Sequence, residues 1–478
     1  MDKQEKIFRE YSVWRAIFTM ALPVMLMMAV MILYNIADMF FVSQLGDTAK
    51  VAAVSIIGPV FALVMAVGNM IGGGGCALLA RMLGEGRKDL VKRYSSLCCY
   101  GSLILGFIAA VLILICRAPL LKFLGANTDT YASAETYLCI LAAGAPVMIF
   151  TAAFANILRS VGAVREGMIA NLLGTAVNVV LDPVMILGLH MDVAGAAGAT
   201  VIGNICAMLM IVILIYRKGY GLSLSLREAF SVRGQDEKKY GFLRDFGSIA
   251  AIGLPNLVST GLSSFAGAFA NNLLVSYGTA AVAAMAAAGK STMVISMIQM
   301  GLCMGVQPLM AYSYGAGDRR RLSEVMKKLT ILTVSLGSVL TLLCFTGSHV
   351  LIAIFIKEAS AAALGEKMIR LLVISGPFFG LFYLGCNFLQ ASGNAPLAAF
   401  VSVLRQGLFL IPLLFIMNHF FGVTGNICAN IVADIAASAV SVTLTLVQYR
   451  KLQKTDGRKN LQKNGKKVLS AADGICEN

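Results

Sequence analysis

The sequence has 478 residues, of which 58% are hydrophobic and only 13% are charged, and its mean hydropathy is +0.80. A soluble domain carries about a quarter charged residues, so the composition excludes an ordinary soluble protein. The formal net charge of +15 comes from basic segments that separate long apolar stretches.

The apolar stretches predict an all-α integral membrane protein. A run of about 20 apolar residues crosses the hydrocarbon layer as a helix, whereas a membrane barrel reads as short alternating strands. The start, Met1-Asp2-Lys3-Gln4-Glu5-Lys6, contains acids, and no small-residue cleavage site follows it, so we expect a membrane helix first rather than a cleaved signal peptide. Twelve spans are predicted, near residues 14–43, 51–78, 95–116, 134–158, 166–189, 194–216, 245–276, 280–310, 325–348, 362–390, 396–418 and 424–449.

These spans divide the chain into four parts. They are a six-helix lobe (1–216), a connector (217–243), a second six-helix lobe (244–450) and a basic tail (451–478). Lys and Arg collect on the cytoplasmic side of membrane proteins. Most of them lie at the two ends of the chain and in the connectors on that same side, and few lie in the opposite loops. Both termini and the connector are therefore predicted to be cytoplasmic. The charge indicates topology rather than nucleic-acid binding, and the tail can contact anionic lipid.

The second half repeats the pattern of the first at one constant spacing. The matching segments are Ala21-Leu22-Pro23 with Gly253-Leu254-Pro255, Leu45-Gly46 with Tyr277-Gly278, Leu83-Gly84-Glu85-Gly86 with Tyr314-Gly315-Ala316-Gly317, Pro146 with Pro377, Asn156 with Asn387, and Gly162 with Gly393. Each half has an even number of spans, so we expect parallel repeats related by a pseudo-twofold axis along the membrane normal. Transporters use this architecture and carry their substrate between the halves.

Four polar residues in the first half predict a cation-coupling site. Asp38 and Asp182 lie inside spans, where ionisable groups usually face the bundle interior or a cavity. Asn178 precedes Asp182 by one helical turn, and Thr200 lies at a similar depth in the next span. Oxygen ligands of this kind suit a hard monovalent ion, with Na+ as the candidate metal, and two neighbouring carboxylates tend to share a proton. The alternative is that both acids only bond to backbone near helix ends.

The second half carries different charges inside its spans. Ala and Leu replace the two acids at the matching positions, so coupling is expected in the first half alone. Lys290 and Asp434 lie at a similar depth, and we expect them to form an ion pair, because an unpaired charge is costly there. Arg405 lies closer to the cytoplasm. For these three residues, structural pairing and a role in a substrate cavity remain equally open.

Two further patterns concern packing and binding. Gly72–Gly75 is a run of four glycines, which predicts close helix packing. Several of the 25 methionines cluster between Met20 and Met39 and can shape an adaptable apolar wall. One segment is similar to the end of a phosphate-binding loop: Ala288-Gly289-Lys290-Ser291-Thr292. The first glycine of the loop motif is missing from the sequence before it, so no nucleotide is expected to bind.

Together these segments resemble the multidrug and toxic compound extrusion (MATE) family of the larger flippase superfamily, over residues 10 to 450. The resemblance rests on Ala21-Leu22-Pro23 with Asp38 and Leu45-Gly46, on Asn178-Val179-Val180-Leu181-Asp182-Pro183, on Gly305-Val306-Gln307-Pro308 with Tyr314-Gly315-Ala316-Gly317, and on Arg405-Gln406 before Ile411-Pro412. It implies export of organic, often cationic, compounds and drugs across a bacterial cell membrane, in exchange for Na+ or H+. The family's amino-lobe cation site maps to Asp38, Asn178, Asp182 and Thr200. No other cofactor is expected, and the protein is expected to act as a monomer.

Two other functions compete with antiport. A lipid-linked oligosaccharide flippase of the same superfamily would favour a cavity with several cationic side chains, whereas only Lys290 and Arg405 lie inside the spans. An intramembrane enzyme would need a paired catalytic motif, which the sequence lacks. Antiport is therefore the predicted function.

Overall fold

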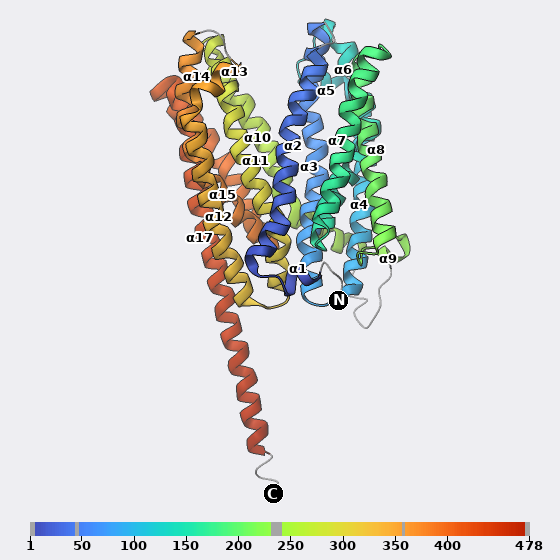
Figure 1. Ribbon diagram of the computed structural model, residues 1–478, viewed down its shortest axis with the longest axis vertical. Helices are drawn as coiled ribbons and strands as arrows, with labels where there is room; N and C mark the ends of the chain where they lie inside the picture. The colour runs from blue at the N-terminus through green and yellow to red at the C-terminus, as the bar shows by residue number, and fades with distance from the viewer. Residues whose placement is uncertain (1–4, 44–46, 231–240, 356–358, 474–478) are drawn as a thin grey trace.

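The computed structural model describes residues 5–43, 47–230, 241–355 and 359–473, which fold into long helices lying side by side (Figure 1). Within these ranges, 11 helices are long and apolar enough to cross a membrane. The last of them, Ala395–Leu452, contains two spans, because its backbone breaks at Gly422 (φ 57°, ψ −136°). The predicted twelve-helix architecture is confirmed.

The first lobe begins at the end of the bundle that also carries the carboxy terminus (Figure 1). Its spans are α2 (Val13–Ser43), α3 (Thr48–Gly84), α4 (Lys88–Ile115), α6 (Thr128–Ser160), α7 (Val164–Pro183) with the π-helical η1 (Val184–Gly188), and α8 (Asp192–Lys218). Short helices α1 (Glu5–Arg9) and α9 (Leu226–Phe230) lie at this end, and α5 (Arg117–Phe123) lies at the other.

The second lobe follows the same order. Its spans are α10 (Phe242–Val275), α11 (Thr279–Gly315), α12 (Arg319–Thr346), α14 (Ala359–Leu372) continued by η3 (Val373–Ser375) and α15 (Gly376–Ala391), α16 (Ala395–Val403) continued by the π-helical η4 (Leu404–Leu410), and α17 (Ile411–Asp473). Short α13 (Ser348–Phe355) lies at the end opposite the termini.

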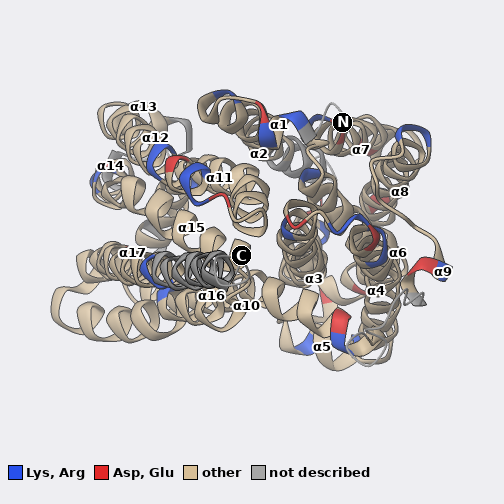
Figure 2. Ribbon diagram, turned by 90° about the horizontal axis from the view of Figure 1, so that it is seen from below, with Lys and Arg blue, Asp and Glu red and all other residues tan. Residues whose placement is uncertain are grey.

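The packing of the helices obeys the predicted pseudo-twofold symmetry. In the first lobe α6 packs against α3, α4 and α8, and in the second α15 packs against α11, α12 and α17. Between the lobes, α2 packs on α11 and α10 packs on α3. The first helix of each lobe thus packs on the second helix of the other lobe, as a twofold axis requires. Viewed along the bundle axis, the helices of the first lobe and those of the second lobe form two separate groups (Figure 2). The halves are thus parallel repeats, as expected.

The lobes meet most closely through glycines. Gly74 of α3 faces Gly253 of α10, and a Cβ on either residue would overlap a carbonyl oxygen of the facing helix. Gly84 of α3 and Gly315 of α11 make the same kind of contact nearer the terminal end. The close packing predicted for Gly72–Gly75 is confirmed, because an added Cβ at each of these four positions would crowd a neighbouring helix.

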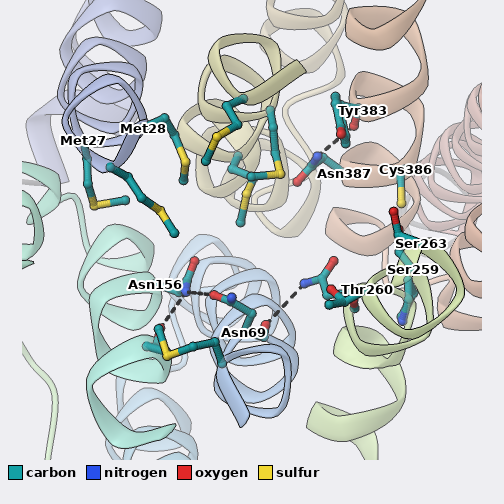
Figure 3. A pocket seen from close by; sticks show the side chains of 18 of the residues that line it. Met27, Met28, Asn69, Asn156, Ser259, Thr260, Ser263, Tyr383, Cys386 and Asn387 are labelled. Atoms are coloured by element: carbon teal, nitrogen blue, oxygen red, sulfur yellow. Dashed lines mark hydrogen bonds between the residues drawn. The ribbon is translucent and has the colours of Figure 1, made fainter. Parts of the chain in front are cut away.

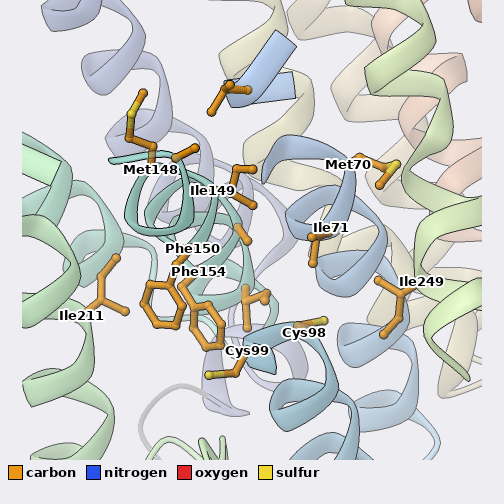
Figure 4. Packing of buried hydrophobic residues seen from close by; sticks show 14 of the residues in the cluster. Met70, Ile71, Cys98, Cys99, Met148, Ile149, Phe150, Phe154, Ile211 and Ile249 are labelled. Atoms are coloured by element: carbon orange, nitrogen blue, oxygen red, sulfur yellow. The ribbon is translucent and has the colours of Figure 1, made fainter. Parts of the chain in front are cut away.

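The first helix of each lobe also crosses into the other lobe. Ile17 and Met20 of α2 belong to a hydrophobic cluster with residues of α11, α12 and α15. Ile249 of α10 belongs to the cluster formed by α3, α4 and α6 (Figure 4). A buried ion pair adds to this contact, since Arg93 Nη2 of α4 lies 2.7 Å from Asp245 Oδ2 of α10. Farther along, α2 packs on α7 and α10 packs on α16, each within its own lobe.

Replacing Gly253 with Val tests the glycine contact. We expect Gly253→Val to lower the free energy of unfolding by about 1–3 kcal/mol, because the added methyl groups overpack a helix interface. The measurement is thermal unfolding of the purified protein in detergent. Gly261→Val on the same helix is the matched control, since nothing lies within 4 Å of a Cβ there. Equal melting temperatures for the two variants would contradict the prediction.

Candidate cation site and central cavity

Three of the four residues predicted for cation coupling meet in one buried cluster. Asn178 and Asp182 lie one turn apart on α7, Thr200 lies on α8, and all three are buried. In the amide orientation that satisfies its neighbours, the Asn178 oxygen accepts from the Thr200 N–H at 2.9 Å and its nitrogen donates to Asp182 Oδ2 at 3.3 Å. Carboxylate, amide and backbone groups therefore meet away from water.

Local sequence explains why the cluster forms at this point. Gly174 on α7 and Gly203 on α8 face one another, and an added Cβ on either would crowd the other's carbonyl oxygen. This close approach places Asn178 and Thr200 against each other one turn farther along. Pro183 then ends α7, and the chain continues as π-helical η1. Such π-helical turns are frequent at functional sites.

Helix α2 supplies a residue that the sequence analysis missed. The Tyr34 hydroxyl accepts from the Asn178 amide nitrogen at 3.1 Å. Its position one helical turn before Asp38 is the signal that could have identified it. The side chain of Asp38 itself lies outside the described residues. Its convergence with the other three thus stays a prediction.

The expected ion pair between Lys290 and Asp434 is wrong. Asp434 on α17 is bound by Arg405, whose Nε lies 2.8 Å from Asp434 Oδ1. Lys290 is exposed, and the residues of α11 that line the space beside Asp434 include Gly289 and Met293. A residue next to Gly289 in a helix points about 100° away from it. Similar depth in the membrane therefore did not give Lys290 the right direction.

Arg405 is held by aromatic rings as well as by Asp434. Its guanidinium carbon lies 5.0 Å from the ring centroid of Phe379, 4.9 Å from that of Phe382 and 5.9 Å from that of Tyr383. A cation over aromatic faces at these distances is stabilised by the ring quadrupoles. Arg405 belongs to η4, so in this lobe the π-helical segment itself carries the charged residue, whereas in the first lobe Asp182 lies in α7 just before η1.

A cavity of about 620 Å³ lies between the two lobes (Figure 3). Methionines form much of its apolar lining, and they come from α2, α3 and α11: Met27, Met28, Met31, Met65, Met297, Met300 and Met304. The expected methionine wall is present in part, because Met27, Met28 and Met31 belong to the cluster identified in the sequence. Arg405 is the one charged side chain that the described residues contribute to this lining.

Amide side chains form a hydrogen-bonded network that joins the lobes at this cavity. Asn156 Nδ2 donates to Asn69 Oδ1 at 3.2 Å within the first lobe. Asn256 of α10 donates to the Asn69 carbonyl oxygen at 3.3 Å, and Gln390 Nε2 of α15 donates to Asn256 Oδ1 at 3.1 Å. Sequence reasoning used Asn156 only as a repeat marker. The network depends on contact between lobes, which no local pattern records.

A double-mutant cycle tests the Arg405–Asp434 pair. Arg405→Gln and Asp434→Asn should each lower the free energy of unfolding by about 3–5 kcal/mol, because each leaves a buried charge without its partner. The double variant should lose much less than the sum, since two amides can bond to one another. Thermal unfolding in detergent is the measurement. Lys290→Gln is the control and should leave the melting temperature unchanged. Additive losses would show that the two residues do not interact.

Comparison with known proteins gives consistent matches along the chain. The MatE family model matches residues 23–184 and 255–416, one match in each lobe. The multidrug export protein MepA of Staphylococcus saprophyticus is 31% identical over 452 residues, which cover 94% of this chain and 97% of the relative. MepA of Staphylococcus aureus strain NCTC 8325 is 30% identical over 454 residues, again covering 94% and 97%.

Solved structures show the same fold. A structure titled "Crystal structure of MATE in the straight conformation" has a TM-score of 0.86 and 23% identity, and the match covers 95% of this chain and 100% of that one. An outward-facing multidrug resistance MATE family transporter of the MOP superfamily has a TM-score of 0.85 and 23% identity, covering 95% and 99%.

Proposed function

Because the chain belongs to the MatE family, we propose that it is an antiporter that exports organic compounds, in particular cationic drugs and xenobiotics, in exchange for Na+ or H+. The observation that carries the proposal is the central cavity, which both lobes line and whose described polar groups, apart from Arg405, are mainly amides and hydroxyls (Figure 3). A methionine-rich wall can adapt to ligands of different shape. This surface suits many substrates better than a single one.

The arrangement of the lobes supports alternating access. Glycine contacts hold the lobes together toward the end that carries the termini, at Gly74 with Gly253 and at Gly84 with Gly315. Parallel-repeat transporters expose a site between their halves by rocking one half against the other. We propose that separation at these contacts opens the cavity toward the cytoplasm.

Helix α2 links the proposed cation site to the cavity. Met27 and Met31 of α2 line the cavity, and Tyr34, one turn farther along, bonds to Asn178 in the buried cluster. These residues follow the i, i+4, i+7 spacing of one helix face. A cation or proton held by Asp182 and its neighbours changes the charge beside Tyr34. Movement of α2 in response would alter the cavity wall, which couples the two sites.

The location of the charges supports a cell-membrane protein with cytoplasmic termini. The described start and end of the chain lie at one end of the bundle (Figure 1), and Lys and Arg residues lie on the helix ends there (Figure 2). By the positive-inside rule we assign this end to the cytoplasm. The protein is proposed to be a monomer in contact with membrane lipid.

A lipid-linked oligosaccharide flippase fits this cavity less well. Binding a diphosphate favours several cationic donors, and Arg in particular. Among the described residues that line the cavity, Arg405 is the single cation, and it is already paired with Asp434. The charge of the cavity thus favours organic compounds of low net negative charge.

Transport in vesicles tests the coupling assignment. Purified protein in liposomes should drive a cationic dye against its gradient when a Na+ or a pH gradient is imposed separately. Asp182→Asn and Asp38→Asn should each lower gradient-driven transport at least about tenfold, because the ion can no longer be held and released by a carboxylate. The protein should stay folded, as judged by its melting temperature.

The matched control is Asp129→Asn, because Asp129 is exposed in the first turn of α6. It should transport like the unaltered protein. If Asp182→Asn and Asp38→Asn both keep full gradient-driven transport, the two carboxylates are structural and the coupling assignment fails.

A further inference from the structure

The central cavity has an unusual distribution of charge for an exporter of cations. Its described lining contains methionines, amides, hydroxyls and aromatic rings, and its one charged member is Arg405. No carboxylate belongs to this described lining. Asp434 lies behind Arg405 and lines a second, smaller cavity of about 250 Å³ within the carboxy-terminal lobe, which Arg405 and Gln406 also line. Arg405 therefore stands between the two cavities.

The geometry of the ion pair leaves much of the guanidinium available. Asp434 accepts from Nε at 2.8 Å. A guanidinium has five N–H donors in a planar fork. Asp434 uses one, and the Tyr383 hydroxyl is a second side-chain hydrogen-bond partner, so up to three remain. Phe379 and Phe382, with centroids 5.0 and 4.9 Å from the guanidinium carbon, limit the movement of the plane. A fork held in one orientation loses little entropy when it binds a planar anion.

The geometry of this fork suits a carboxylate. A carboxylate can accept two parallel N–H bonds from a guanidinium, which is the strongest common side-chain pairing. Removing a carboxylate from water is costly unless such a partner is already in place. Amide donors elsewhere in the lining, such as Asn256 and Gln390, already bond to one another. Arg405 is thus the group in the lining best suited to receive an anionic oxygen pair.

The charge balance of the cavity favours a zwitterion over a simple anion as the ligand. Arg405 and Asp434 together are neutral, so a simple anion would place one uncompensated negative charge in the cavity. A zwitterion brings its own positive charge and leaves the total unchanged. Its cationic part can lie against the methionine and amide wall, where sulfur and carbonyl dipoles are polarisable or electron-rich.

We propose that Arg405 is the residue of the central cavity that binds the carboxylate of an exported compound. This inference rests on the proposed export function and deepens it by naming the side chain that distinguishes ligands with a carboxylate from ligands without one. Asp434 acts as a positioning residue, because it holds the Nε edge and leaves the remaining N–H donors for the ligand.

A matched pair of fluorescent dyes tests the subsite. The carboxylate form of a rhodamine is zwitterionic, and its ester keeps the same ring system and positive charge but lacks the carboxylate. Both dyes are measured for binding to purified protein and for export from liposomes. The unaltered protein should bind and export both.

The variant for the test is the double substitution Arg405→Gln with Asp434→Asn, which leaves no buried charge unpaired. We expect its affinity for the carboxylate dye to fall on the order of tenfold, while its affinity for the ester stays within about twofold. Arg405→Lys keeps the charge and loses the fork, so it should also weaken the carboxylate dye selectively. Lys290→Gln removes an exposed cation of the same lobe and should change neither dye.

The outcomes separate the two proposals. Equal losses for both dyes in the double variant would show that Arg405 is structural, and the subsite would be overturned. Unaltered protein that exports the ester but neither binds nor exports the carboxylate dye would overturn the subsite alone. Unaltered protein that exports neither dye under any gradient would overturn the proposed function together with it.

Discussion

The backbone contact between α3 and α10 sets the position of the central cavity. Gly74 and Gly253 allow the two helices to approach until only backbone separates them. One turn beyond this contact, Asn256 reaches the carbonyl oxygen of Asn69 at 3.3 Å, and Gln390 reaches Asn256 in turn. A larger side chain at the contact would move these amides out of bonding distance. The positions of the amide side chains that face the cavity therefore depend on the glycines beside it.

The duplicated scaffold carries chemistry that is not duplicated. Both lobes place a π-helical segment in their fifth span, η1 in the first and η4 in the second. In the first lobe Asn178 and Asp182 lie in this span and Thr200 lies in the next one, and none of the three belongs to the described lining of the central cavity. In the second lobe Arg405 lies in the π-helical segment and lines the cavity directly. Symmetric packing thus holds different side chains in the two lobes, which is the basis for the division of roles that we propose, with ion coupling in the first lobe and ligand contact in the second.

Sequence reasoning predicted what depends on a single helix or on adjacent helices. Span number, parallel repeats and the meeting of Asn178, Asp182 and Thr200 followed from hydropathy, spacing and depth. It failed for Lys290, because depth says nothing about the direction of a side chain around its helix axis, and Arg405 bonds to Asp434 instead. The amide network could not be predicted at all, because Asn69 and Asn256 meet only when the two lobes pack together. Contacts between distant segments are the part that a linear pattern does not contain.

The crossing of α2 and α10 between lobes has a consequence for the biogenesis of the protein. The ribosome delivers the first six spans before α10 and α11 exist, and domains generally fold in the order of synthesis. During that interval Ile17 and Met20 of α2 have no α11 to contact, and Gly74 of α3 has no α10 to face. The amino-terminal lobe thus reaches its final packing only after the eighth span has been inserted. The first half alone therefore lacks part of its native packing, and only synthesis of the second half can supply it.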